Sequence, residues 1–225
     1  MTIVAAASSR ERARRSPAGL VFGSATILTL VGIAIWLFFN PVWVSFEQGR
    51  TRADLWTGYT TETVRTVTDS VLAEVYLGPG TFAQSVDGTP VFNERERAHM
   101  ANVRGVVVAF FGLVLLAAAV LVVGGIRSRG AAWYWRAVAR GSAVLAIGAV
   151  VVGIAFALAF EQAFTLFHDL FFAPGTWSFD PATDRLVQLF PDAFWTETSV
   201  AIAIVGLLLT LATWAFARHR ALKEA

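Results

Sequence analysis

No cysteine occurs in this chain of 225 residues, which excludes disulfide bonds, thiolate metal sites and a cysteine nucleophile. Charged residues are also scarce. They make up 15% of the chain, whereas soluble domains carry about a quarter. Hydrophobic residues make up 56%. This balance indicates a protein that is embedded in lipid.

Several catalytic and binding motifs are missing as well. The absence of a GxSxG motif argues against a serine hydrolase. The formal net charge is only +2 and no nucleic-acid motif occurs, so we predict no nucleic-acid partner. No HExxH-like spacing is present. Two histidines near the acids Glu94, Glu96 and Asp169 leave zinc as an alternative, but we predict neither a metal nor a cofactor.

Four long uncharged runs are what the chain does contain. They are Ser16 to Phe46, Gly105 to Ile126, Gly141 to Phe160 and Thr198 to Ala217. A helix needs about 20 apolar residues to cross a bilayer, so each run is long enough for one span. The sequence therefore predicts an all-α integral membrane protein. It has four transmembrane helices and a small extracytoplasmic cap that contains helices and a β-hairpin.

The first run resembles a signal peptide because arginines precede it. Its apolar core is too long for one, and no small-residue cleavage site follows. We therefore expect a retained anchor, with a cleaved signal as the alternative.

The positive charges indicate which side each segment faces. Positively charged residues, all of them arginines except Lys223, cluster in the N-terminal tail, in the connection 127–140 and in the C-terminal tail. The positive-inside rule makes these three segments cytoplasmic. The expected order is a basic cytoplasmic tail (1–17), a first span (18–40), an extracytoplasmic segment with an amphipathic helix and a hairpin (41–102), a second span (103–126), a cytoplasmic connection (127–140), a third span (141–160), a second extracytoplasmic segment (161–197), a fourth span (198–217) and a cytoplasmic tail (218–225).

Three local signals organise the first extracytoplasmic segment. Apolar residues at helical spacing predict an amphipathic helix over 60–77, with Thr60 as its cap. Asp87-Gly88 predicts a hairpin turn. Asn93, followed three residues later by Glu96, predicts a capping box. We expect the helix that begins there to continue into the second span, with His99 in its first turns.

The second extracytoplasmic segment opens with an aromatic stripe. One helical face carries Phe160, Phe164, Phe167, His168 and Phe171. We expect this helix to extend the third span. Beyond it, Asp180 is a suitable cap for a short helix with Pro181 at its first position, which Pro191 would end.

His99 and His168 are thus predicted at the same membrane face and at similar depth. A short connection joins spans two and three, so the spans are expected to be antiparallel neighbours and the two rings could converge. Ionisable groups near a bilayer are costly and tend to mark function, and a partly dry imidazole acts as a base. The structural alternative is that each histidine merely fills an amphipathic interface.

Two blocks of the sequence resemble a known family. "ERAHMANVRGVV" (96–107) followed by "FHDLFF…TWSFDPATDRLVQLFPDAFW" (167–195) is similar to a bacterial family of four-span membrane proteins that includes the lipoprotein intramolecular transacylase. The resemblance implies an enzyme of the bacterial cytoplasmic membrane. Such an enzyme moves the sn-2 acyl chain of a diacylglyceryl lipoprotein to the amine of its N-terminal cysteine. Membrane lipids and diacylglyceryl-modified lipoproteins are the implied partners.

By the same resemblance, His99 and His168 are the catalytic pair. The expected substrate-binding residues are Phe164, Phe167, Phe171, Trp177 and Arg185. The expected supporting residues are Asp169, Asn102 and Asp180. Asn102 stands at a position where we expect an acid. A non-catalytic membrane protein, such as a sensor or an assembly subunit with an extracytoplasmic domain, is the alternative function.

Overall fold

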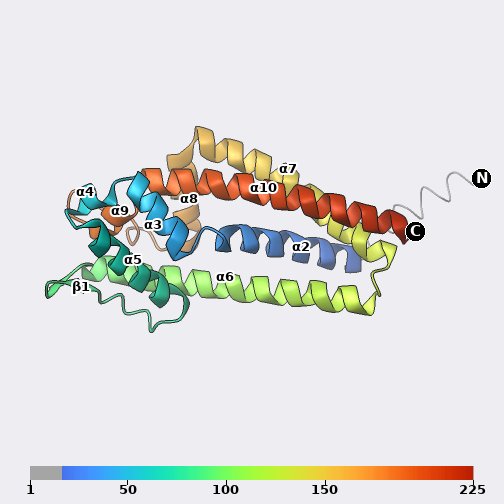
Figure 1. Cartoon of the computed structure of the whole chain (residues 1–225), viewed down its shortest axis with the longest axis horizontal. Coiled ribbons are helices and arrows are strands. Elements are labelled where there is room, and N and C mark those ends of the chain that lie inside the picture. The colour runs from blue at the N-terminus through green and yellow to red at the C-terminus, as the bar shows by residue number, and fades with distance from the viewer. Residues whose placement is uncertain (1–16, 225) are drawn as a thin grey trace, which may run out of the picture. The chain divides into compact units, whose positions relative to one another are not determined.

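The computed structural model describes residues 17–224, apart from the side chains of residues 155–157. Helices dominate this part of the chain, which also contains a short β-hairpin (Figure 1). In chain order the elements are α2 (Pro17–Trp36), α3 (Pro41–Arg50), α4 (Ala53–Thr57), α5 (Thr61–Tyr76), β1 (Ser85–Val86), β2 (Thr89–Pro90), α6 (Glu94–Arg127), α7 (Ala132–Leu158), α8 (Phe160–Phe171), α9 (Arg185–Leu189) and α10 (Asp192–Lys223). All but the last residue of the basic tail expected at 1–17 lies outside the described residues.

Within residues 17–224, four helices are long and apolar enough to span a membrane. They are Pro17–Trp36, Glu94–Arg127, Ala132–Ile154 and Asp192–Lys223. A helix satisfies its own backbone hydrogen bonds, which the hydrocarbon interior cannot do. The predicted all-α fold with four membrane helices is confirmed.

The chain divides into two compact units. The first contains the described residues of Met1–Ala34, Gly112–Val151 and Ala203–Ala225, and the second contains Ile35–Phe111 and Val152–Ile202. Small residues allow close helix packing in the first unit. A side chain on Gly141 would collide with the backbone of Gly23, and one on Gly124 would collide with the ring of Phe22. Glycine is therefore needed where α2 approaches α6 and α7.

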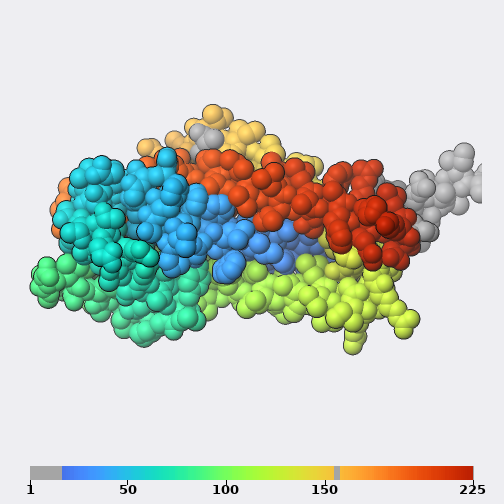
Figure 2. All heavy atoms as spheres, viewed as in Figure 1, coloured from blue at the N-terminus to red at the C-terminus, as the bar shows by residue number. Residues whose placement is uncertain are grey.

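Short helices surround the core of the second unit. Figure 1 shows α3, α4, α5 and α9 gathered near the beginning of α6. On the face seen in Figure 2, the atoms of α3, α4 and α5 lie against one another without a gap. Gln48 of α3 joins this group from within, because its buried amide donates to Thr68 Oγ1 (2.9 Å) and to the carbonyl oxygen of Leu189 (3.0 Å).

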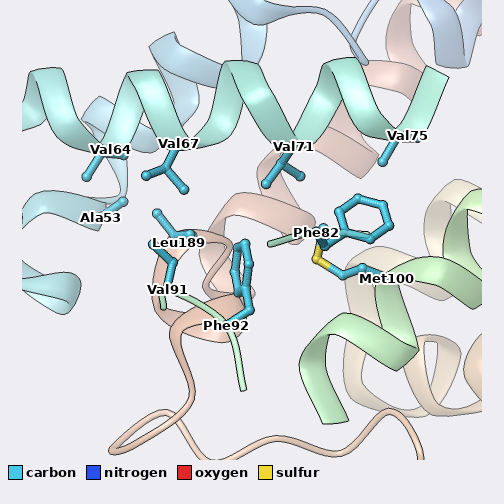
Figure 3. Close-up of a cluster of buried hydrophobic side chains, with 10 residues drawn as sticks. All are labelled: Ala53, Val64, Val67, Val71, Val75, Phe82, Val91, Phe92, Met100 and Leu189. Carbon is cyan, nitrogen blue, oxygen red and sulfur yellow. The ribbon is translucent and has the colours of Figure 1, made fainter. Parts of the chain in front are cut away.

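The core beneath these helices follows from the pattern of α5. Its buried side chains at helical spacing point toward residues from α4, from the hairpin segment 82–92, from α6 and from α9 (Figure 3). The residues of this core are Ala53, Val64, Val67, Val71, Val75, Phe82, Val91, Phe92, Met100 and Leu189. Met100 belongs to α6 and Leu189 to α9, so the core joins the helix that carries His99 to the segment that follows His168. The predicted amphipathic helix is confirmed.

The turn and cap predictions are also confirmed. Thr60 Oγ1 accepts from the backbone N–H of Thr63 (3.1 Å) at the start of α5. Strands β1 and β2 pair in antiparallel fashion across Asp87 and Gly88. Both turn residues have positive φ (50° and 77°), which is the geometry of the tight hairpin turn that Asp-Gly favours.

Two expectations about helix boundaries need correction. The third membrane helix does not run unbroken into the aromatic stripe, because α7 ends at Leu158 and Ala159 has a non-helical backbone (φ −146°, ψ 52°) before α8 begins. The short helix begins at Arg185 rather than after Asp180. Asn40, the last residue of the span expected at 18–40, caps a separate helix, α3, with a proline at its start.

Candidate active site

His99 is positioned by the capped start of α6. The backbone N–H of Glu96 donates to Asn93 Oδ1 (3.0 Å), and the backbone N–H of Asn93 donates to Glu96 Oε2 (2.7 Å). This is the reciprocal capping box that the spacing predicted. His99 lies one turn further along the helix and is only 6% exposed.

The same first turn of α6 binds the loop that follows α8. Glu96 Oε1 accepts from the backbone N–H of Leu186 (2.7 Å), and Asn93 Nδ2 donates to Asp184 Oδ1 (2.8 Å). Arg95 Nη2 donates to the carbonyl oxygen of Ser178 (2.8 Å). Glu96 is almost completely buried, with 1% exposure. These three bonds therefore fix the loop against the helix that carries His99.

His168 lies on α8 and is 9% exposed. Its ring centroid is 4.0 Å from that of Phe164, 5.4 Å from that of Phe167 and 4.9 Å from that of Trp177. Its Nδ1 lies 2.8 Å from the carbonyl oxygen of Phe164. A carbonyl can only accept, so Nδ1 carries the proton and the neutral ring keeps a free lone pair on Nε2.

Burial is the largest influence on His168 and lowers its pKa, while the bond to the Phe164 carbonyl and the charge of Asp169 act in the opposite direction. The cause is the cost of placing a charged imidazolium among aromatic rings. His168 is therefore neutral at pH 7 and can accept a proton there.

The two histidine rings meet inside this aromatic cluster. Their centroids are 6.0 Å apart and their planes are inclined by 25°. Phe172 contacts both rings, at 4.9 Å from His99 and 5.5 Å from His168. Phe179 lies 5.4 Å from His99. The predicted convergence of the two imidazoles is confirmed, and it places them among aromatic rings, close enough for one ring to accept a proton while the other donates one.

Most of the predicted aromatic residues surround His168. Phe164, Phe167 and Trp177 contact its ring directly. Phe171 instead packs on Phe167, with ring centroids 4.9 Å apart. Phe167 and Phe171 are both about half exposed, so the aromatic cluster continues from the buried histidine to the surface of the second unit.

Arg185 does not join the histidine rings. Its guanidinium lies over the ring of Tyr59, 5.3 Å from the centroid, and Nη1 donates to Gln188 Oε1. A cation–π contact and a hydrogen bond therefore hold this side chain away from the histidine rings, and its expected role in binding the substrate stays a prediction.

The three predicted supporting residues also lie outside the cluster of rings. Asp169 is exposed beside His168, and its charge reaches the ring without a hydrogen bond. Asp180 accepts from the backbone N–H of Ala182 (2.9 Å) and so stabilises a turn. Asn102 is exposed on α6.

Phe172 and Phe179 are the residues that sequence reasoning missed. Both touch His99, yet neither lies on the helical stripe, because Phe172 follows the last residue of α8 and Phe179 belongs to the loop. The density of phenylalanine and tryptophan after His168 was the available signal. Among residues 17–224, no group of three or more histidine or acidic side chains is arranged to hold a metal ion.

The model of the family described as lipoprotein intramolecular transacylase Lit matches residues 19–195, which is well over half of the chain. The chain belongs to this family. Lit proteins are integral membrane acyltransferases, and the family resemblance inferred from the two sequence blocks is confirmed.

Solved structures of Lit from Bacillus cereus have the same fold. One has a TM-score of 0.77 and 18% identity, and the match covers 92% of this chain and 95% of that one. A variant of the Bacillus protein with a histidine-to-arginine substitution matches with a TM-score of 0.76 and 18% identity, over 100% of this chain and 98% of that one.

An uncharacterised protein of Aquifex aeolicus (strain VF5) is 27% identical over 127 residues, which is 56% of each chain. The match thus spans just over half the length of this curated relative.

Proposed function

We propose that this protein moves the sn-2 acyl chain of a diacylglyceryl-modified lipoprotein to the α-amino group of its N-terminal cysteine. The observation that carries the proposal is the pair of buried imidazoles, His99 and His168, whose ring centroids lie 6.0 Å apart. Membership of the Lit family supports the choice of substrate.

The reaction is the aminolysis of an ester. The neutral α-amine attacks the sn-2 carbonyl carbon, and the nitrogen must then lose a proton. The bond to the glycerol oxygen breaks, and that oxygen must gain a proton. The products are an amide and a free glycerol hydroxyl, so no cofactor and no water are consumed. One base and one acid suffice, and each contributes about 10²–10⁴-fold in rate.

His168 is the better base of the pair. Its Nδ1 proton is held by the Phe164 carbonyl, which leaves Nε2 to accept the proton of the amine. His168 passes this proton to His99, which protonates the leaving glycerol oxygen, so both rings are neutral again when the products have formed. A single imidazolium among aromatic rings is already costly, which favours passing the proton on rather than storing it.

The aromatic residues supply the remaining requirements. Phe164, Phe167 and Phe171 form a continuous apolar path from His168 toward the surface, and this path suits an acyl chain. A dry pocket favours attack by the amine over hydrolysis by water. Because donor and acceptor belong to one molecule, holding them together supplies a further share of the rate.

We also propose that the histidine pair faces the extracytoplasmic leaflet and that both termini are cytoplasmic. The arginine clusters at 127–140 and 218–225 support this orientation. The absence of native cysteine allows a clean test. Thr89→Cys in the hairpin should react with a membrane-impermeant maleimide in intact cells, whereas Glu224→Cys should react only after lysis. The reverse pattern would contradict this orientation.

The activity is tested by mass spectrometry of lipoprotein N-termini. Cells that lack N-acylation of their own should produce an N-acylated lyso form when they express the wild type, and should lose it with His99→Ala or His168→Ala. If the wild type yields only diacylglyceryl lipoprotein and binds a stable protein partner instead, the protein is a non-catalytic membrane module. If both variants keep full activity, the catalytic pair is wrong.

A further inference from the structure

Trp177 carries a buried hydrogen-bond donor that the fold does not use. Its Nε1 is among the buried side-chain atoms of the described residues that have no hydrogen-bond partner. An indole N–H can only donate, and more than nine in ten buried polar groups in proteins are paired. An unpaired buried donor therefore points to a ligand that supplies the acceptor.

The position of Trp177 places this donor beside the reacting centre proposed above. Its ring centroid is 4.9 Å from that of His168 and 6.4 Å from that of Phe164. Hydrogen bonds fix the loop before and after Trp177 in the sequence. The backbone N–H and the hydroxyl of Thr176 both donate to the carbonyl oxygen of Ala173, and Arg95 binds the carbonyl oxygen of Ser178.

The chemistry of ester aminolysis needs such a donor. When the amine attacks, the carbonyl oxygen becomes negatively charged, and in a dry pocket that charge requires a hydrogen bond. The two imidazoles are already assigned to moving protons, and His168 Nδ1 is committed to the Phe164 carbonyl. The other unpaired side-chain atom among these rings is His99 Nδ1, which belongs to the proposed acid.

We propose that the indole N–H of Trp177 donates a hydrogen bond to the sn-2 carbonyl oxygen and stabilises the oxyanion that forms during transfer. This inference rests on the proposed transacylase function and adds a catalytic residue to it. It also selects the substrate, because an sn-2 ester offers the acceptor and an sn-2 ether does not.

The first test is the rate of transfer by Trp177→Phe, which keeps an aromatic ring and removes the N–H. With a synthetic diacylglyceryl lipopeptide in detergent micelles, we expect the rate constant to fall about 10²–10³-fold. Trp135→Phe is the matched control, because Trp135 also has a buried, unpaired Nε1 but lies in the first unit, and it should retain the wild-type rate. Should Trp177→Phe fail to fold, Trp177→Leu also removes the N–H and adds no other hydrogen-bond donor.

A binding measurement separates the hydrogen bond from simple packing. The probes are two lipopeptides with an acetylated N-terminus, which cannot react, one with an sn-2 ester and one with an sn-2 ether. The wild type should bind the ester about 2- to 10-fold more tightly, and this preference should disappear in Trp177→Phe.

An equal loss of affinity for both probes, or an unchanged rate, would overturn the role of Trp177. If the wild type itself forms no lyso product, the proposed function fails instead.

Discussion

At the scale of single residues, the protonation state of His168 governs the proposed reaction. Burial lowers the pKa of this imidazole below its ordinary value of 6.5, despite the opposing charge of Asp169. The neutral, base-competent form therefore persists below pH 6.5. We expect the rate constant of acyl transfer to fall at acidic pH with a midpoint below pH 6.5. The measurement uses the lipopeptide between pH 4.5 and 8.

Asp169→Asn should move this limb further toward low pH, because it removes a charge that raises the pKa of His168. The shift will be small, since Asp169 is exposed and water screens its charge.

The lowered pKa of His168 also makes the stability of the fold depend on pH. As the pH falls below 6.5, the unfolded imidazole takes up its proton first, so the folded state loses stability until the lowered pKa is passed. A midpoint at or above 6.5 in a folded sample would contradict the role of His168 as a neutral base.

At the scale of elements, the first turn of α6 organises the site. Glu96 accepts hydrogen bonds from Asn93 and Leu186 while 1% exposed. Glu96→Ala leaves these two donors without a partner, which costs about 1–3 kcal/mol each. We expect a lower Tm and a slower transfer, because the loop that carries Trp177 and Phe179 loses one of the three hydrogen bonds that fix it against the helix of His99. Glu94→Ala is the control, since Glu94 is exposed in the same turn. Equal Tm values for the two variants would show that the buried carboxylate has no such role.

The close approach of α2 and α7 gives a second prediction at this scale. A Cβ on Gly141 would collide with the backbone of Gly23, whereas one on Gly148 meets nothing within 4 Å. Gly141→Ala should therefore destabilise the protein by about 1–3 kcal/mol. Gly148→Ala, in the same helix, should be neutral or stabilise it by up to about 1 kcal/mol, because alanine favours helix. The comparison is made by thermal unfolding in detergent, and similar losses for both variants would contradict the packing described here.

Local signals predicted the elements whose causes are local. The Asp87-Gly88 turn and the capping box of Asn93 and Glu96 depend on neighbouring residues, and both formed as expected. The break at Ala159 was not predictable in this way, because no proline or glycine marks it. The start of α3 also has a local signal, Asn40-Pro41, which stands where the first span was expected to end.

At the scale of the whole molecule, topology brought the candidate site together. His99 and His168 are 69 positions apart, and the expectation that they converge came from their predicted position at the same membrane face. What the sequence could not supply was the environment of the rings. Phe172 and Phe179 reach His99, and Arg185 turns to Tyr59, through tertiary contacts that no periodicity encodes.

The central claim is that the two histidines transfer an acyl chain within one lipoprotein. It is tested most directly with purified protein in lipid vesicles and a synthetic diacylglyceryl lipopeptide whose sn-2 chain alone is deuterated. Tandem mass spectrometry should find the deuterated chain as an amide on the N-terminal cysteine, with conversion about 10²–10⁴-fold slower in His99→Ala and in His168→Ala. A label that stays on the glycerol with the wild type, or an undiminished rate in the two variants, would contradict the claim.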